Sequence, residues 1–221
     1  MSNSDCWYQE VCQLKHDNCE CHCIRYIEMK YLMENCNLPK NKQYPIELTP
    51  SKSDFKAFER LKEIKDDIVD FVENGRNLYL CSAITGNGKT SWAIKMMHKY
   101  FDEIWDGNDF RIRALFIHVP TFLIKCKDFK STDDEFERLK KYIPHVDLVV
   151  WDEIAATDMS SYDYSQLLMY IDARSLDNKS NIYTGGVTDR DTMEKLLGTR
   201  LTSRIWANNT EIIEFFGGDR R

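Results

Sequence analysis

The sequence predicts an α/β protein with a parallel five-stranded sheet covered by helices on both faces. Two observations carry this prediction. Short apolar segments alternate with helical patterns along most of the chain, as parallel sheets require. One segment, Leu78–Cys81, runs through a glycine-rich turn directly into a helix, whereas another, Val146–Trp151, ends on two adjacent carboxylates. The residues with the most informative chemistry therefore follow two of the predicted strands.

The composition is that of a globular protein without a membrane span. Of the 221 residues, 43% are hydrophobic and 30% are charged, which suits one core and a small extra module. No apolar run reaches the ~18–20 residues of a membrane helix, and the N-terminus shows no signal-peptide pattern. We therefore expect a cytoplasmic protein with no membrane partner. The net charge of −6 argues against a protein that coats nucleic acid, but it permits a local basic groove.

The N-terminal segment is rich in cysteine and histidine. Six of the eight cysteines lie in the first 36 residues, and such clustering in a cytosolic protein indicates metal binding rather than disulfides. A structural zinc ion would supply folding energy to a segment too short for its own core. The alternative is a tail of free thiols. The preferred zinc ligands are Cys6, Cys12, Cys19 and Cys23, with Cys21, His16 and His22 as substitutes.

A helix and a linker are expected after this cluster. Apolar residues at helical spacing predict a helix over residues 24–35, which can pack on the metal module or present an apolar face to a partner. Residues 1–38 are therefore treated as one N-terminal module. Three prolines and many polar residues between 39 and 53 predict a linker. The expected apolar stripe of the helix is Ile24, Ile27, Tyr31 and Leu32, broadened by Tyr26, Met29 and Met33.

The main domain is expected to span residues 54–221. Its first helix is capped by Ser53 or Asp54. Two later cysteines, Cys81 and Cys126, lie in apolar patterns and should be small buried hydrophobic residues. The expected strands are 78–81, 114–119, 146–151, 181–184 and 211–216, and the expected helices are 55–73, 89–100, 121–127, 132–142, 162–176, 190–197 and 198–206.

The glycine turn in LYLCSAITGNGKTSW has the pattern of a phosphate-binding loop. Glycines let backbone N–H groups line a phosphate nest, and the following helix adds its dipole. Lys89 would contact the β/γ-phosphates, and the Thr90 hydroxyl would ligate Mg²⁺. Ala83 replaces the usual first glycine, so its φ stays negative or some strain is accepted. The alternative is an ordinary turn before a helix. The expected ATP-binding residues are Ala83, Ile84, Thr85, Gly86, Asn87, Gly88, Lys89, Thr90 and Ser91.

The strand in VDLVVWDE delivers Asp152 and Glu153 to its C-terminal end. In P-loop NTPases this arrangement is the Walker B motif, in which the aspartate holds the Mg²⁺ shell. The glutamate in the next position suits a general base that polarises the attacking water. Two solvated acids at a strand end are the alternative. The glutamate favours a hydrolytic enzyme over a kinase.

The order of these features resembles the bacterial and phage replicative-helicase loaders of the DnaC/DnaI type, a branch of the AAA+ ATPases. The resemblance covers residues 54–221 well and the N-terminal module more loosely. The motif GTRLTSRI and the lack of a helical lid point to the loader branch. The resemblance implies ATP hydrolysis in an oligomer, docking of the N-terminal module on the hexameric replicative helicase, and contact with single-stranded DNA. It places the protein in a bacterial cell or a phage-infected host.

The resemblance also assigns roles near the C-terminus. Arg204 matches the arginine that AAA+ proteins insert in trans into a neighbour's ATP site, and Arg200 is the second choice. A surface ion pair is the alternative for Arg204. Gly186 stands where the family usually has a polar sensor, often Asn. Thr184 or Thr188 would then make that contact.

Other functions share parts of this pattern. A transposition-associated AAA+ ATPase acting on a transposase would have the same catalytic core. A small P-loop kinase would need an acceptor pocket and an arginine-rich lid, and a non-hydrolysing adaptor would use ATP only as a structural ligand. Ala83 and Gly186 both depart from the usual pattern at contact positions, so we expect slow turnover.

Overall fold

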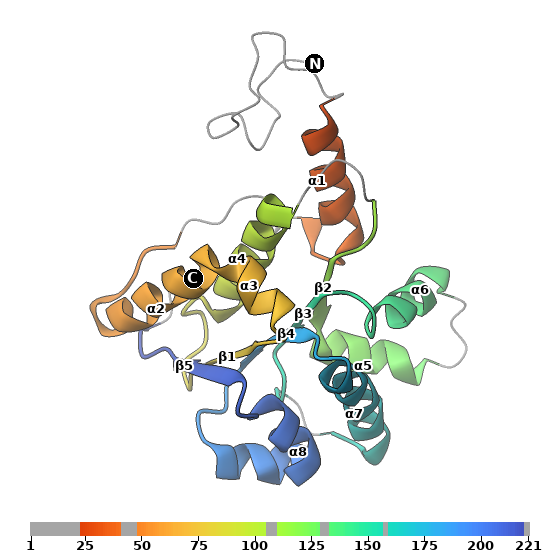
Figure 1. Ribbon diagram of the computed structural model, residues 1–221. Coiled ribbons are helices and arrows are strands. Elements are labelled where there is room, and N and C mark those ends of the chain that lie inside the picture. Colours follow the sequence, from red (N-terminus) through yellow and green to blue (C-terminus); the bar gives the residue numbers. More distant parts are fainter. Residues whose placement is uncertain (1–22, 41–47, 105–109, 129–132, 157–158, 219–221) are drawn as a thin grey trace.

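A computed structural model of the chain describes residues 23–40, 48–104, 110–128, 133–156 and 159–218. It confirms the predicted class, because all five strands are parallel and form one sheet in the order β2-β3-β4-β1-β5. Helices lie on both sides of this sheet (Figure 1). The strands are β1 (Asn77–Cys81), β2 (Ala114–His118), β3 (Leu148–Asp152), β4 (Ser180–Gly185) and β5 (Thr210–Glu214).

Two hydrophobic clusters fill the space between the sheet and its helices. Side chains of α1 to α4 form one cluster, and side chains of α5 to α8 form the other. The helices are α1 (Ile24–Asn35), α2 (Phe55–Asp66), α3 (Ile68–Glu73), α4 (Lys89–Ile104), α5 (Val119–Lys127), α6 (Asp134–Tyr142), α7 (Ser161–Leu176) and α8 (Arg190–Ile205), with a 3₁₀ turn η3 (Lys52–Asp54) before α2.

Strand β1 lies between β4 and β5 and is buried along its whole length. Its side chains alternate between the two clusters, because successive residues of a strand point to opposite faces. Leu78 and Leu80 join the cluster of α1 to α4, whereas Tyr79 and Cys81 join the other. This two-sided burial explains why the sequence of β1 is continuously apolar. It also fixes the phosphate loop that follows on a rigid strand.

The prediction of one helix over residues 55–73 is wrong at its centre. Asp67, with φ −111° and ψ 29°, separates α2 from α3. Asp54 does not cap α2 with its side chain. Its carboxylate instead accepts hydrogen bonds from the backbone N–H groups of Phe216 (2.7 Å) and Gly217 (3.0 Å). The fully buried Asp54 therefore joins the start of α2 to the segment after β5.

Helix α1 has the predicted bounds but a different buried face. Ile24 and Ile27 are 43% and 38% exposed, whereas Met29, Leu32 and Met33 are buried in the same cluster as α4. The stripe predicted through the two isoleucines is wrong because the helix packs through its methionines, whose flexible side chains fill irregular gaps. Helix α1 therefore shares its core with the main domain.

The residues after α1 pair with the edge strand β2. The carbonyl oxygen of Cys36 accepts a hydrogen bond from the Phe116 N–H (2.8 Å), and the Asn37 side-chain amide donates to the Phe116 carbonyl (2.7 Å). Leu38 is buried beside them. Residues 24–38 are thus attached to the sheet, while a docking role for residues 1–38 stays a prediction.

Most other boundaries fall within about two residues of those predicted, a common uncertainty at element ends. Helix α4 continues past Tyr100 to Ile104. The two helices predicted on either side of Gly198 are joined as α8, with a kink at that glycine, whose φ is 73°. A left-handed φ of this kind favours glycine.

Candidate nucleotide site

The phosphate loop connects β1 to α4 at the C-terminal edge of the sheet. Its positive φ angles occur at Gly86 (73°) and Gly88 (101°), the two glycines of GNGKT. Ala83 does not adopt a positive φ. The departure from the usual pattern at this position therefore introduces no left-handed strain, which settles the choice left open by the sequence.

The loop is braced by a serine and an asparagine. The Ser82 hydroxyl accepts hydrogen bonds from the Asn87 side-chain amide (2.6 Å) and the Ile84 N–H (3.1 Å), and it donates to the Phe215 carbonyl (2.7 Å). Asn87 is fully buried. Sequence reasoning missed the roles of Ser82 and Phe215, because the two residues are 133 positions apart and no local pattern connects them.

Lys89 is almost fully buried, at 6% exposure. Its ammonium group donates to the Ile84 carbonyl oxygen and to the Asn87 side-chain oxygen, both at 3.2 Å. Both acceptors belong to the phosphate loop itself. The structure thus places the positive charge of Lys89 within the loop where the sequence predicted it.

Two predicted residues meet between the phosphate loop and β3. The Thr90 hydroxyl donates to Asp152 Oδ1 at 2.7 Å, and the fully buried Thr184 hydroxyl donates to the same oxygen at 2.7 Å. A carboxylate beside a hydroxyl offers the oxygen ligands that Mg²⁺ prefers. The residues present therefore fit the Mg²⁺ site that the sequence predicts at Thr90 and Asp152.

Glu153 follows Asp152 in a left-handed conformation with φ 59°. Its N–H donates to the Thr184 hydroxyl (3.0 Å), and the next N–H, that of Ile154, donates to the Thr184 carbonyl (2.8 Å). This φ is strained for a non-glycine residue, and such a conformation persists only where the surrounding structure holds it. Thr184 therefore fixes the backbone that carries both predicted acids.

The predicted sensor positions lie at the end of β4. Thr184 contacts Asp152 and the Glu153 backbone, as described above. Gly186 is exposed, and a Cβ built there would approach the Ser82 carbonyl oxygen only at 3.9 Å, which is ordinary contact. Space for a side chain thus exists at Gly186. Thr188 is half-buried.

The two candidate finger arginines are brought together on α8. Arg204 Nε donates to Asp172 Oδ1 on α7 at 2.6 Å, and Arg200 forms a short ion pair with Asp172 Oδ2. Burial opposes ionisation of Asp172, but the hydrogen bonds from both arginines hold its pKa below the usual value. Asp172 was not identified from the sequence, because its partners lie on another helix.

Cys81 and Cys126 are both buried. Burial raises the pKa of the Cys81 thiol to about 12 and that of Cys126 to about 11, so both stay neutral, as predicted for small buried residues.

Of the proposed zinc ligands, only Cys23 lies within the described residues, directly before α1, where it is a free thiol. Cys6, Cys12, Cys19, Cys21, His16 and His22 lie outside them. In the described part, no group of three or more metal-ligating side chains is found.

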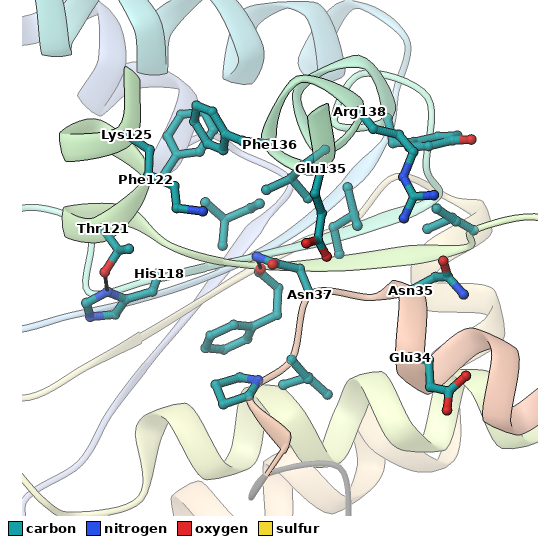
Figure 2. A pocket seen from close by; sticks show the side chains of 18 of the residues that line it. Glu34, Asn35, Asn37, His118, Thr121, Phe122, Lys125, Glu135, Phe136 and Arg138 are labelled. Atoms are coloured by element: carbon teal, nitrogen blue, oxygen red, sulfur yellow. Dashed lines mark hydrogen bonds between the residues drawn. The ribbon is translucent and has the colours of Figure 1, made fainter. Parts of the chain in front are cut away.

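A cavity of about 530 Å³ lies beside β2, between the end of α1 and helices α5 and α6 (Figure 2). Figure 2 shows side chains of both charges around it: Glu34 and Glu135, against Lys125 and Arg138. His118 ends β2 there and hydrogen-bonds Thr121 at 2.8 Å. The phosphate loop and the two predicted acids do not line this cavity.

No family model and no curated protein matches the sequence. Solved structures do match. The chain is similar to the DnaC helicase loader (TM-score 0.63, 16% identity, covering 77% of this chain and 94% of that one) and to DnaI (TM-score 0.62, 18% identity, 84% and 95%). It also matches AMPPCP-bound DnaA from Aquifex aeolicus (TM-score 0.56, 17% identity), covering 86% of this chain and 52% of DnaA.

None of the helices in the described ranges is both long and apolar enough to span a membrane. The matches show that this chain shares its fold with the DnaC helicase loader, with DnaI and with DnaA.

Proposed function

We propose that this chain binds and hydrolyses Mg-ATP as a loader of a replicative DNA helicase. The observation that carries the proposal is the 2.7 Å contact between the Thr90 hydroxyl and Asp152 Oδ1. It joins the phosphate loop to the acid-tipped strand, as a Mg-ATP site requires. The neighbour DnaA was solved with the ATP analogue AMPPCP, which supports ATP as the nucleotide.

Each residue of the site has a separable role. Lys89 binds the β/γ-phosphates, and Thr90 and Asp152 would hold Mg²⁺, which neutralises charge on the phosphate oxygens. Glu153 orients and deprotonates the attacking water. Arg204 enters from a neighbouring subunit and stabilises the charge of the transition state. Turnover would then require an oligomer.

Replacing the general base separates ATP binding from hydrolysis. We expect Glu153→Gln to bind ATP with unchanged affinity but to release phosphate at least about 100-fold more slowly. Glu59→Gln, at an exposed position of α2, is the matched control and should behave as wild type. Affinity is measured with a fluorescent ATP analogue and turnover by phosphate release. Full turnover by Glu153→Gln would refute the assigned base.

Helicase loading is favoured by two neighbours that this chain covers over nearly their whole length. This chain covers 94% of the DnaC loader and 95% of DnaI. A small kinase would instead need an acceptor pocket and an arginine-rich lid. One DnaA neighbour was solved with single-stranded DNA, which supports single-stranded DNA as a second ligand of this chain.

A binding assay tests the loader directly. The full chain is mixed with purified bacterial replicative helicases, with and without ATP, and complexes are detected by pull-down. We expect one helicase to be retained, and deletion of residues 1–22 to abolish retention. A larger deletion would be uninformative, because Met29, Leu32 and Met33 belong to the domain core. Capture of a transposase but of no helicase would favour the transposition-associated alternative.

The cysteine-rich segment is proposed to hold one structural zinc ion, with Cys23 as the ligand nearest to α1. Metal analysis of the intact protein should give one Zn²⁺ per chain. The quadruple variant with serine at Cys6, Cys12, Cys19 and Cys23 should give none. A wild-type protein without zinc would support the free-thiol alternative.

A further inference from the structure

Helices α7 and α8 carry three charged side chains that contact one another. None of the three belongs to the ATP site of the same chain. Asp172 of α7 accepts hydrogen bonds from both Arg200 and Arg204 of α8. The Asp172 side chain is only 15% exposed, whereas those of Arg204 and Arg200 are 38% and 63% exposed. A largely covered carboxylate thus fixes two arginines that reach toward the surface.

The two arginines use different atoms in this contact. Arg204 donates through Nε, which lies at the base of the guanidinium group, and Arg200 donates through the terminal Nη2. An Nε contact fixes the plane of the guanidinium while both terminal amino groups extend beyond it. Arg200 instead directs a terminal group at the carboxylate. The geometry therefore distinguishes Arg204 from Arg200 as the residue prepared to contact a further ligand.

The charges support the same distinction. Two guanidinium groups against one carboxylate leave a net charge of about +1 at this site. Arg200 offsets the charge of Asp172, so that Arg204 can be held by a carboxylate while the site as a whole stays positive. An arginine paired alone with an aspartate would present a neutral ion pair to an anionic ligand.

We propose that Asp172 is a positioning residue, which holds Arg204 so that its terminal amino groups face the phosphates of ATP bound to a neighbouring subunit. This inference rests on the proposed ATP hydrolysis in an oligomer. Asp172 would act only through the arginine of its own subunit. It would contribute to kcat and not to the affinity of its own subunit for ATP.

A double-variant comparison tests this dependence. We expect Asp172→Ala to lower kcat about 10- to 100-fold, because misplacing a catalytic group by about 1 Å has effects of that size. Asp172→Asn keeps one acceptor for Nε and should lose less. If Asp172 acts through Arg204, then Asp172→Ala combined with Arg204→Ala will be no slower than Arg204→Ala alone. Additive losses would overturn the proposal.

Mixing subunits tests whether the action is in trans. Lys89→Ala subunits bind ATP only weakly but retain Arg204, so they should restore turnover to Asp172→Ala subunits. Subunits that carry both Lys89→Ala and Asp172→Ala should fail to do so. The matched control is Glu194→Gln, which removes the carboxylate partner of Arg190 on the same helix and should leave kcat unchanged.

The outcomes separate this inference from the proposed function. A wild-type protein without ATP turnover contradicts the proposed function itself. Turnover that depends on Arg204 in trans, but is unchanged in Asp172→Ala, overturns only the role of Asp172. A lower melting temperature of Asp172→Ala at unchanged kcat would show that the contact merely stabilises the fold.

Discussion

The parallel sheet buries a positively charged side chain at each end of its strands. We call the end where the strands begin the first edge and the end where they finish the second edge. At the edge where the strands begin, Arg174 of α7 is completely buried. At the edge where the strands end, Lys89 is nearly so. The two cations differ in what surrounds them. Arg174 is held by acceptors from several elements, whereas the hydrogen bonds described for Lys89 go to Ile84 and Asn87 of its own loop.

Arg174 connects the segment before β3 to the start of β4. Burial lowers its pKa to about 9, which is still above neutral pH, so the side chain is buried as a cation. Its five acceptors allow this, because a buried charge is tolerated when it is hydrogen-bonded. They are the carbonyl oxygens of Ile143 (2.7 Å), Val146 (2.8 Å), Asp147 (3.3 Å) and Ser180 (2.5 Å) and the side-chain oxygen of Asn181 (2.7 Å).

The acceptors of a buried charge distinguish one that stabilises the fold from one that serves nucleotide binding. The acceptors of Arg174 lie on β4 and on the loop between α6 and β3, which cannot move without disturbing the sheet. The acceptors of Lys89 sit on a glycine-containing loop, which can exchange them for phosphate oxygens. We therefore expect substitutions at the first edge to affect stability, and those at the second to affect nucleotide binding and turnover.

The largest expected effect is on stability at the first edge. Arg174→Ala leaves a cavity and unpaired buried carbonyl groups, and should lower the free energy of unfolding by about 3–5 kcal/mol. Urea denaturation measures this loss. Arg190→Ala, at an exposed position of α8, is the control and should change stability little. A small loss in Arg174→Ala would show that the hydrogen-bonded network is not structural.

The next effect is on binding at the second edge. Lys89→Ala removes the charge that contacts the phosphates, and should weaken ATP binding by about 2–3 kcal/mol. Stability without nucleotide should fall much less than in Arg174→Ala. Titration with a fluorescent ATP analogue checks the affinity, with Lys99→Ala on the same helix as control. Retained affinity would refute the assignment of the phosphate loop.

A smaller effect is expected at Thr184, which contacts Asp152 and also holds the backbone of Glu153. Thr184→Val keeps the shape of the side chain but removes the hydroxyl that contacts Asp152 and the Glu153 N–H. We expect turnover to fall by a factor that corresponds to about 1–2 kcal/mol, with ATP affinity nearly unchanged. Phosphate release at saturating ATP measures the difference. If affinity falls and turnover does not, Thr184 contacts the nucleotide as a sensor.

The smallest effect concerns pH at the first edge. Burial alone would raise the pKa of Asp147, but its hydrogen bond with Arg113 and the charges of Arg113 and Lys179 lower it overall. The stability from this depressed pKa is therefore complete above the unfolded-state value of about 3.9, and it is lost as the pH falls through the folded-state value. Asp147→Asn should flatten this acid-dependent loss, which is expected to be about 1 kcal/mol or less. An unchanged pH profile of unfolding would contradict it.

The sequence was sufficient for the fold class, and it pointed to Thr90 and Asp152, which the structure brings into contact. Glycine, lysine and threonine at fixed spacing after a strand predicted the phosphate loop, and the acid-tipped strand predicted Asp152, because both motifs are local. Asp172, Ser82 and Phe215 were not predicted, because their partners are remote in the chain. The predicted stripe of α1 was wrong at Ile24 and Ile27, because the apolar residues of this helix spread over more than one face.

The hydrogen bond from Ser82 to the Phe215 carbonyl has a consequence for biosynthesis. Its two ends leave the ribosome 133 residues apart. Among the described strands, β5, which pairs with β1, is synthesised last. During translation the phosphate loop therefore lacks its support until β5 and Phe215 have emerged. A ribosome-bound chain that stops before β5 should be unable to retain ATP, even though every residue of the loop itself has long been synthesised.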